Sequence, residues 1–392
     1  MLEAANSGLT PVFAAFTIDA NHRRDGTLSP AEGPRRRREG ESPLTGSIDL
    51  IAAMPKIDLH LHLDGCIRPE TLIRLARERK RPLPETEPER LLPYMRAAPD
   101  NANLTEYLTK FDFVLPHLQD AEALELAAFE CVQQTAESGG IYAEVRFAPM
   151  LHTRESLSAD DAIRAVARGL ARGEAECGIP ARAIVICMRH HDEAANLAAV
   201  EAAARHAGHG VVAVDLAGDE SRWPASAFRR VFEAAAALGL PATIHAGEAA
   251  GPENIREAVE RLGAVRIGHG VRAWEDPDVT ALLRERRIPL EMCPTSNIQT
   301  RAVRGWDAYP LRRYASEGLV VTVNTDNPTV SGTTIADEYR LLRDRLGMPP
   351  REIAALVLNA ADAAFLEPSA KQALKARALA ALASLGLAPD SP

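Results

Sequence analysis

The amino-acid sequence predicts a (β/α)8 barrel with a helical insertion after the first strand and extra helices at the C-terminal end. Three observations predict this fold. Short apolar, β-branched runs recur eight times after residue 56, and stretches with helical spacing lie between them. Alternating strands and helices indicate a parallel sheet, and eight such units over roughly 250 to 300 residues have the size of a barrel. An open, doubly wound sheet is the alternative, but no GxGxxG follows any of the runs.

The predicted strands are the runs at residues 57–62, 142–147, 182–188, 211–216, 242–246, 265–269, 289–293 and 319–324. Helical spacing is clearest in ADDAIRAVARGLARGEAECG (159–178) and in PENIREAVERLG (252–263), which ends on a Gly as helices commonly do. The stretch from Arg68 to Gly140 exceeds one helix, so it predicts an extra helical subdomain. Residues 350–387 predict one or two helices packed outside the barrel.

The first 50 residues differ in composition from the rest of the chain. Residues 18–47 are rich in Arg, Gly, Pro, Ser and Glu and have almost nothing to bury, which predicts disorder. The basic run from Arg35 to Arg38 is interpreted as part of a solvated tail rather than a binding patch. We therefore expect residues 1–50 to be an extension and residues 51–388 to form a single catalytic domain, and translation could start at Met54.

Charge and cysteine content exclude several classes of protein. A formal net charge of −9 gives no general attraction for nucleic acid or anionic membranes, and it suits a small neutral or cationic ligand. No apolar run approaches the roughly 18 to 20 residues of a membrane span, and no signal peptide is recognisable at the N-terminus. Five cysteines without a CxxC pair argue against a disulfide framework. The sequence thus predicts a cytoplasmic protein and indicates no particular oligomeric state.

The stretch IDLHLHLDG (57–65) places two histidines one residue apart inside an apolar run. A strand projects alternate side chains to one face, so His60 and His62 should point the same way. Two imidazoles on one face suit a metal ion, although two hydrogen-bonded histidines of the core or rim would give the same pattern.

Other polar residues fall where predicted strands end. The fourth, fifth, sixth and eighth strands run into DLAGDE (215–220), HAGE (245–248), GHG (268–270) and NTDN (324–327). Catalytic side chains of barrels gather at the carboxyl ends of the strands. We therefore expect these groups to meet His60 and His62 at one rim.

The residue types at this rim predict a metal-dependent hydrolase. Three neutral nitrogens and a carboxylate suit Zn²⁺, one ion per subunit, better than Mg²⁺ or Ca²⁺, whereas cobalt, iron or nickel would also be accepted. A metal lowers the pKa of bound water toward neutrality. Two polar groups remain for acid–base work, His269 beside the water and Glu248 beside the leaving group. The predicted ligands are His60, His62, His245 and Asp326.

The chain resembles the adenosine deaminase family of the amidohydrolase superfamily. The resemblance rests on motifs in a fixed order, from about Lys56 to about Leu366: KIDLHLHLDGCIRPETL, YAEVRFAP, CMRHH, VVAVDLAGDE, TIHAGE, RIGHG, EMCPTSN and VTVNTDNP. It implies zinc-dependent hydrolytic deamination of adenosine and 2′-deoxyadenosine to inosine and 2′-deoxyinosine plus ammonia, as in purine salvage. It also implies the same four metal ligands.

The resemblance further implies roles for individual residues. Glu248 would give a proton to purine N1, and His269 would orient or deprotonate the metal-bound water. Asp326 would both bind zinc and assist that deprotonation. The implied substrate-binding residues are His62, Asp64 at the ribose 5′-hydroxyl, the backbone N–H of Gly218 at purine N3, and Asn327.

Asn327 departs from the family pattern, which commonly reads TDD where this chain reads TDN. It stands where a carboxyl group would donate a hydrogen bond to purine N7. An amide can make the same donation without being a protonated acid, so we expect purine recognition to survive with an altered preference among 6-aminopurines. The alternative is a simple turn residue before Pro328.

Other functions remain as alternatives. The same chemistry could act on adenine, adenosine monophosphate or an aminodeoxyfutalosine-type nucleoside, although a carboxylate at Asp64 argues against a 5′-phosphate. A catalytically silent metal-binding protein would have no need of Glu248 and His269. Cys293 and Ser296 are interpreted as packing residues at a strand end rather than nucleophiles. His190 and His191 are interpreted as structural or as supporting the metal ligands.

Overall fold

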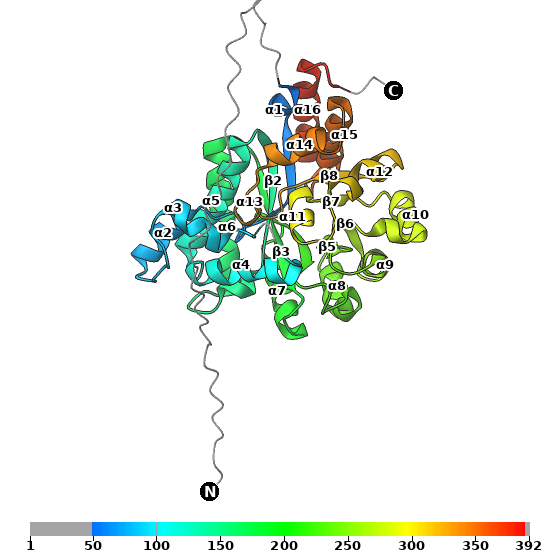
Figure 1. The fold of residues 1–392 in the computed structure, drawn as a ribbon. Coiled ribbons are helices and arrows are strands. Elements are labelled where there is room, and N and C mark those ends of the chain that lie inside the picture. Colours follow the sequence, from blue (N-terminus) through cyan, green and yellow to red (C-terminus); the bar gives the residue numbers. More distant parts are fainter. Residues whose placement is uncertain (1–48, 99–100, 389–392) are drawn as a thin grey trace, which may run out of the picture. The chain divides into compact units, whose positions relative to one another are not determined.

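Eight parallel strands follow one another in chain order around the sheet of this computed structural model, which describes residues 49–98 and 101–388 (Figure 1). The fold confirms the predicted (β/α)8 barrel, and every predicted strand is present. The strands are β1 (Lys56–His62), β2 (Gly140–Phe147), β3 (Ala181–Met188), β4 (Val211–Ala217), β5 (Ala242–Ala246), β6 (Ala264–His269), β7 (Leu290–Met292) and β8 (Val321–Val323).

The sheet closes where β1 meets the segment that follows β8. The N–H of Asp326 donates to the carbonyl of His60, and the N–H of His62 donates to the carbonyl of Asp326, both at 2.8 Å. Below them the Asn324 side chain accepts from the N–H of Leu59 at 2.9 Å. β8 is shorter than the predicted run. β7 is also shorter, and Pro289 before it has no N–H for the ladder.

Paired charges fill part of the barrel interior. The guanidinium of Arg146 on β2 lies 3.0 Å from Asp215 on β4 and 2.8 Å from Glu291 on β7. Arg266 on β6 lies 2.7 Å from Glu291 and 2.6 Å from Glu144. All five side chains are at most 1% exposed, and such burial is tolerable because each charge is paired and hydrogen-bonded.

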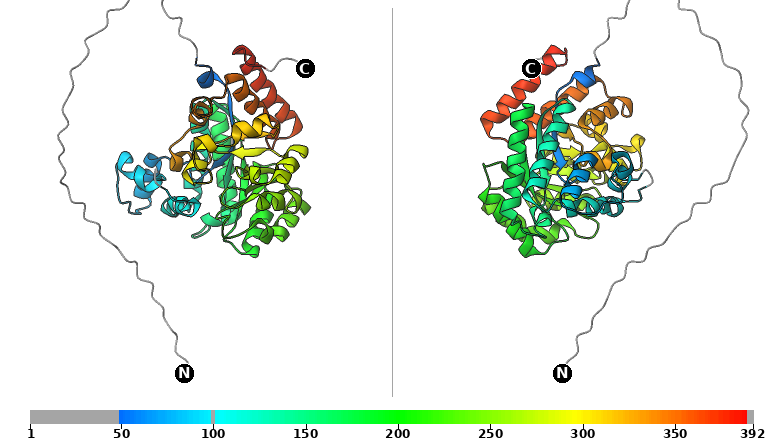
Figure 2. Two further views of the ribbon diagram at one scale, coloured as in Figure 1. Left: turned by 45° about the vertical axis from the view of Figure 1, so that its right-hand side comes forward. Right: turned by 90° about the vertical axis from the view of Figure 1, so that its left-hand side faces the viewer.

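The predicted helical insertion after the first strand is confirmed. It consists of α2 (Pro69–Glu78), α3 (Pro88–Met95), α4 (Leu104–Val114), the 3-10 helix η1 (Leu115–His117) and α5 (Ala121–Glu137). α5 packs closely on α6 (Ala159–Cys177) and on β2, so it belongs to the ring of barrel helices. α2 and α3, in blue and cyan, lie to one side of the barrel in the left view of Figure 2. Of these elements, α4 supplies side chains to the pocket described below.

The remaining helices alternate with the strands or cover the barrel from outside. Residues 350–387 form two C-terminal helices, the first of which packs on β8 and β1. None of the helices within residues 49–98 and 101–388 has the length and apolar character of a membrane span. The remaining helices are α7 (Glu193–Arg205), α8 (Arg229–Ala237), α9 (Pro252–Glu260), α10 (Pro277–Glu285), α11 (Pro294–Gln299), α12 (Leu311–Ser316), α13 (Pro328–Ser331), α14 (Ile335–Asp344), α15 (Pro350–Ala363) and α16 (Pro368–Ser384). The remaining 3-10 turns are η2 (Pro149–His152), η3 (Ala225–Phe228), η4 (Ala273–Glu275) and η5 (Trp306–Ala308).

Two predicted boundaries need comment. α9 ends at Glu260 rather than at Gly263, which has a φ of 71° and turns the chain into β6. The expected disordered extension covers residues 1–50, of which residues 1–48 lie outside the described residues. The described chain starts at Asp49, whose carboxylate accepts from the N–H groups of Ile51 and Ala52 and so caps α1 (Leu50–Ala53).

Candidate active site

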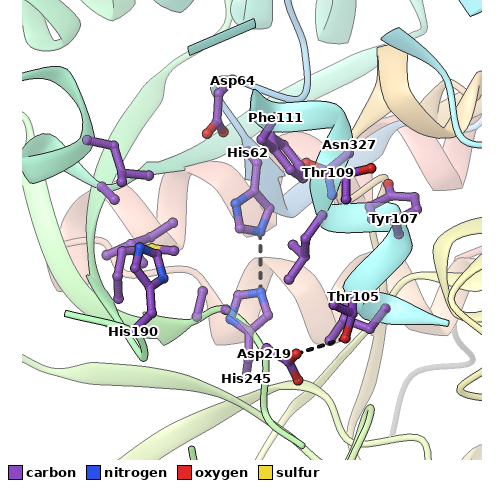
Figure 3. A pocket seen from close by; sticks show the side chains of 18 of the residues that line it. His62, Asp64, Thr105, Tyr107, Thr109, Phe111, His190, Asp219, His245 and Asn327 are labelled. Carbon is purple, nitrogen blue, oxygen red and sulfur yellow. Dashed lines mark hydrogen bonds between the residues drawn. The ribbon is translucent and has the colours of Figure 1, made fainter. Parts of the chain in front are cut away.

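A pocket of about 350 Å³ opens at the carboxyl end of the barrel (Figure 3). α4 and apolar side chains at the ends of β2, β3 and β4 form much of its wall. His60 is fully buried and contacts His62 and His245 at this wall. Every other residue that the sequence assigned to the site lines the pocket itself: His62, Asp64, Gly218, His245, Glu248, His269, Asp326 and Asn327.

Three imidazoles and one carboxylate converge at the base of this pocket. His62 Nε2 lies 3.3 Å from His60 Nε2, 3.3 Å from His245 Nε2 and 3.3 Å from Asp326 Oδ1. Figure 3 shows the His62 and His245 rings facing each other. Ligands that surround Zn²⁺ tetrahedrally at about 2.0 to 2.1 Å lie roughly 3.4 Å apart. The spacing of these atoms therefore fits a bound metal ion.

The other ring nitrogens explain why the Nε2 atoms present lone pairs to one another. His60 Nδ1 lies 2.9 Å from Glu291 Oε2, and His245 Nδ1 lies 3.0 Å from Asp215 Oδ2. Each carboxylate accepts a hydrogen bond from Nδ1–H, which leaves Nε2 of His60 and His245 unprotonated, the tautomer of metal-bound histidine. Lone pairs this close to each other and to Asp326 repel unless a cation lies between them.

His269 stands next to this cluster in a different tautomer. One ligand atom each of His60, His245, His269 and Asp326 lies within 4.8 Å of the others. However, Nδ1 of His269 lies 2.9 Å from the side-chain nitrogen of Asn297, whose oxygen accepts from the Tyr309 hydroxyl and from the Cys293 N–H. The amide nitrogen must therefore donate to Nδ1. Burial holds the pKa of His269 well below its usual value, so the ring is neutral and carries its proton on Nε2.

Glu248 lies beside His269 and is 4% exposed. Its Oε2 lies 3.5 Å from His269 Nε2, and its Oε1 accepts a hydrogen bond of 3.1 Å from the Thr300 hydroxyl. Burial, followed by the negative charges of Asp326 and Glu220, raises the pKa of Glu248 well above its usual value. The raised pKa favours the protonated carboxyl group, which is the form that can donate a proton.

Two more polar groups, Asp64 and Asn327, face the pocket. Burial raises the pKa of Asp64 to about 6, and its carboxyl group points into the space above His62 in Figure 3. Asn327 is 3% exposed, and its Oδ1 has no hydrogen-bond partner among the described residues. Asn327 fits only because Gly65 has no side chain, since a Cβ there would lie 2.0 Å from Oδ1. Both groups can therefore recognise polar atoms of a ligand.

Comparisons with known proteins agree with this geometry. The family model described as "Adenosine deaminase" matches residues 55–380. The chain is 45% identical to an adenosine deaminase of Haemophilus ducreyi over 82% of this chain and 94% of that protein. An adenosine deaminase of Enterococcus faecalis is 43% identical over 83% of this chain and 96% of the relative.

The chain belongs to the adenosine deaminase family. A solved structure of an adenine deaminase from Arthrobacter aurescens is also similar, with a TM-score of 0.77, 29% identity, and coverage of 83% of this chain and 98% of that one.

The structure adds a residue of this adenosine deaminase family member that the sequence analysis misjudged. Ser296 was expected to be a packing residue, but its hydroxyl donates to Asp326 Oδ2 at 2.5 Å. This bond holds one carboxylate oxygen and leaves Oδ1 facing the histidines. The packing expectation holds for Cys293, which is buried. His190 reaches the pocket wall, where Figure 3 shows it away from His62 and His245.

Sequence reasoning also missed the residues that support the site. The charged residues among them share one recognisable signal, a charged side chain inside a buried strand or shortly after its end, where burial demands a partner. Glu291 within LEM of β7 and Arg146 within β2 show it plainly. Asn297 and Thr300 carry no such signal. The missed residues are Arg146, Arg189, Asp215, Glu220, Glu291, Asn297 and Thr300.

Proposed function

We propose that this enzyme carries out zinc-dependent hydrolytic deamination of adenosine and 2′-deoxyadenosine, giving the 6-oxo nucleoside and ammonia. One observation carries the proposal: the Glu248 carboxyl group, whose pKa is raised, lies 3.5 Å from His269 and next to a cluster of three imidazoles and a carboxylate. A 6-aminopurine needs a proton at N1 and a water nucleophile at C6, and these groups supply the two functions from one wall of the pocket.

The chain's own residues divide the work. His60, His62, His245 and Asp326 would hold the zinc ion, which when bound makes water a nucleophile at neutral pH. Glu248 donates its proton to N1, which draws electrons from C6. His269, protonated on Nε2, donates a hydrogen bond and orients the attacking water rather than removing its proton. Asp326, with one oxygen held by Ser296, accepts the proton of the attacking water.

Two polar groups that face the pocket favour a nucleoside. Asp64 would accept from the ribose 5′-hydroxyl, a contact that a free base cannot offer. A 5′-phosphate is disfavoured because the carboxylates of Asp64 and Asp326 would both repel an anion. The Gly218 backbone would meet purine N3, and the Asn327 amide would donate to N7.

We also propose a cytoplasmic location, because all five cysteines are free thiols and four of them are buried. The same chemistry on another 6-aminopurine remains the alternative that the assay must separate from adenosine deamination.

The test is a parallel assay of ultraviolet absorbance loss with adenosine, 2′-deoxyadenosine, adenine, adenosine monophosphate and aminodeoxyfutalosine. Metal-free protein is first reconstituted separately with Zn²⁺, Co²⁺, Fe²⁺ and Ni²⁺. We expect fast loss with the first two substrates and with zinc. Fast turnover of adenine or aminodeoxyfutalosine alone would overturn the substrate assignment but keep the catalytic groups.

A further inference from the structure

The carboxylate of Glu220 sits in a ring of backbone N–H groups. Its Oε1 accepts from Gly247 at 2.7 Å, and its Oε2 accepts from Glu248 at 2.9 Å, Ala249 at 2.9 Å and Ala250 at 3.0 Å. Glu220 is 3% exposed and follows β4, whereas the four N–H groups follow β5. Four successive N–H groups that point to one anion form a concave nest, and here the chain's own carboxylate fills it.

The segment that Glu220 holds carries Glu248. This segment has no helical or strand hydrogen bonds of its own, since it lies between the end of β5 and the start of α9. It is also tightly packed: Gly247 has a φ of 69°, and a Cβ there would lie 2.4 Å from Ile255. The Glu248 backbone is therefore held by the hydrogen bonds that residues 247–250 donate to Glu220, together with those that the carbonyls of Gly247 and Ala249 accept from Arg272.

A buried cation fixes the same junction from the other side. Arg189 is 1% exposed, and its guanidinium donates to the carbonyl of His245 at 2.7 Å and to the carbonyl of Trp223. It thus ties the segment after β4 to the end of β5. The His245 carbonyl before the turn of residues 247–250 is thus held by Arg189, and the N–H groups of the turn are held by Glu220. These two side chains follow β3 and β4, respectively.

We propose that Glu220 is a positioning residue for the proton donor Glu248. Its carboxylate fixes the turn of residues 247–250, and so places the Glu248 carboxyl group where it can reach purine N1. The inference rests on the proposed function, because it assigns Glu220 a task only if Glu248 donates the proton.

The first test is Glu220→Gln, a change of similar size. The Gln amide nitrogen is a donor, so it would face N–H groups and leave some of them without an acceptor. A displacement of about 1 Å at a catalytic group can cost about 100-fold in rate. We expect kcat for adenosine to fall by about 10- to 100-fold, with KM changed by less than about threefold.

Two further measurements separate positioning from general support of the pocket. In a Glu248→Gln background, Glu220→Gln should lower the residual rate by less than about threefold, because the group through which it acts is already gone. Binding of 1-deazaadenosine, which has no N1 to protonate, should change by less than about twofold. A full additional loss in the double variant, or equally weakened 1-deazaadenosine binding, would overturn the proposal.

Folding is controlled with two more variants. Glu220→Asp keeps the charge but retracts it by one methylene, and we expect a fall in kcat that is smaller than for Gln. Glu130→Gln is the matched control. Glu130 lies on α5, is also buried, and accepts from the Arg68 N–H and the Thr71 hydroxyl. We expect wild-type kcat for this control. If Glu248→Gln is inactive while both Glu220 variants keep wild-type kcat, the positioning role fails and the proposed function stands; an active Glu248→Gln removes both.

Discussion

The side-chain amide of Asn297 donates to Nδ1 of His269 at 2.9 Å and thereby decides which ring nitrogen carries the proton. Two further bonds, from the Tyr309 hydroxyl at 3.0 Å and from the Cys293 N–H at 3.3 Å, fix the amide orientation. The sequence had left open whether His269 orients water or removes its proton. With the proton on Nε2, the ring is a hydrogen-bond donor toward the pocket, which supports the orienting role that we propose for His269.

Asn297→Asp tests this tautomer. An aspartate would accept a hydrogen bond from Nδ1–H, so Nε2 would carry a lone pair instead of a proton. The His269 ring would then no longer donate toward the pocket. We expect kcat to fall by about 100- to 1,000-fold, in line with the loss of one fixed donor at an active site. Tyr309→Phe keeps Asn297 and should cost much less. Equal kcat for Asn297→Asp and the wild type would show that His269 can work in either tautomer.

The pH profile of kcat should show a limb on the alkaline side that belongs to Glu248. Its pKa is raised above the usual value, and the protonated form is the active one, so activity is present below that pKa and is lost as the pH rises through it. Glu248→Gln should cost about 1,000-fold or more in kcat, because a glutamine has no proton to give. If the alkaline limb persists unchanged in the residual rate of Glu248→Gln, another group titrates there.

Asp64 should recognise the ribose 5′-hydroxyl. A hydrogen bond to a charged group contributes about 1.5 to 3 kcal/mol, so Asp64→Ala should lower kcat/KM for adenosine by about 10- to 100-fold. The matched control is a substrate, 5′-deoxyadenosine, which has no such hydroxyl and should be turned over equally by both enzymes. An equal loss with both nucleosides would place Asp64 in the support of the metal ligands instead.

Asn327 should act on purine N7. Asn327→Ala is expected to lower kcat/KM for adenosine by about 3- to 10-fold, the effect of one neutral hydrogen bond, and to leave 7-deazaadenosine unaffected. Asn327→Asp should donate only while protonated, so its kcat/KM should decline as the pH rises. A turn residue would instead give the same loss with both nucleosides.

Metal retention should depend on the carboxylates behind the histidines. Asp215→Asn replaces the charged acceptor behind His245 Nδ1 with a neutral amide, and partners of this kind contribute about 10- to 100-fold to metal affinity. Competition with a chelator, read by metal analysis, measures the change directly. Glu338→Gln is the control, because Glu338 is equally buried but contacts Thr295 and Thr333. Similar zinc affinity in Asp215→Asn and wild type would contradict this role.

The sequence predicted much of the fold and the residue types of the site. Period-2 and period-3.6 patterns are local, so the eight strands and the helices between them could be read from short windows. Parallel strands of a barrel bring their carboxyl ends to one rim, and this rule placed HLHLDG, HAGE, GHG and NTDN together before any contact was known. His60, His62, His245 and Asp326 were predicted on that basis, and the structure brings their ligand atoms within hydrogen-bond distance.

Only the tertiary structure decided how these residues are held and protonated. Asn297 and His269 are 28 residues apart, and Glu220 binds N–H groups up to 30 residues away. Arg146 links Asp215 to Glu291 across the barrel interior. Such contacts depend on where loops of unequal length cross and on which rotamer each side chain adopts, and neither leaves a periodic pattern in the sequence. The sequence by itself therefore determined the scaffold and the chemical groups at its rim, whereas the packing of distant segments set the tautomer of His269 and the raised pKa of Glu248.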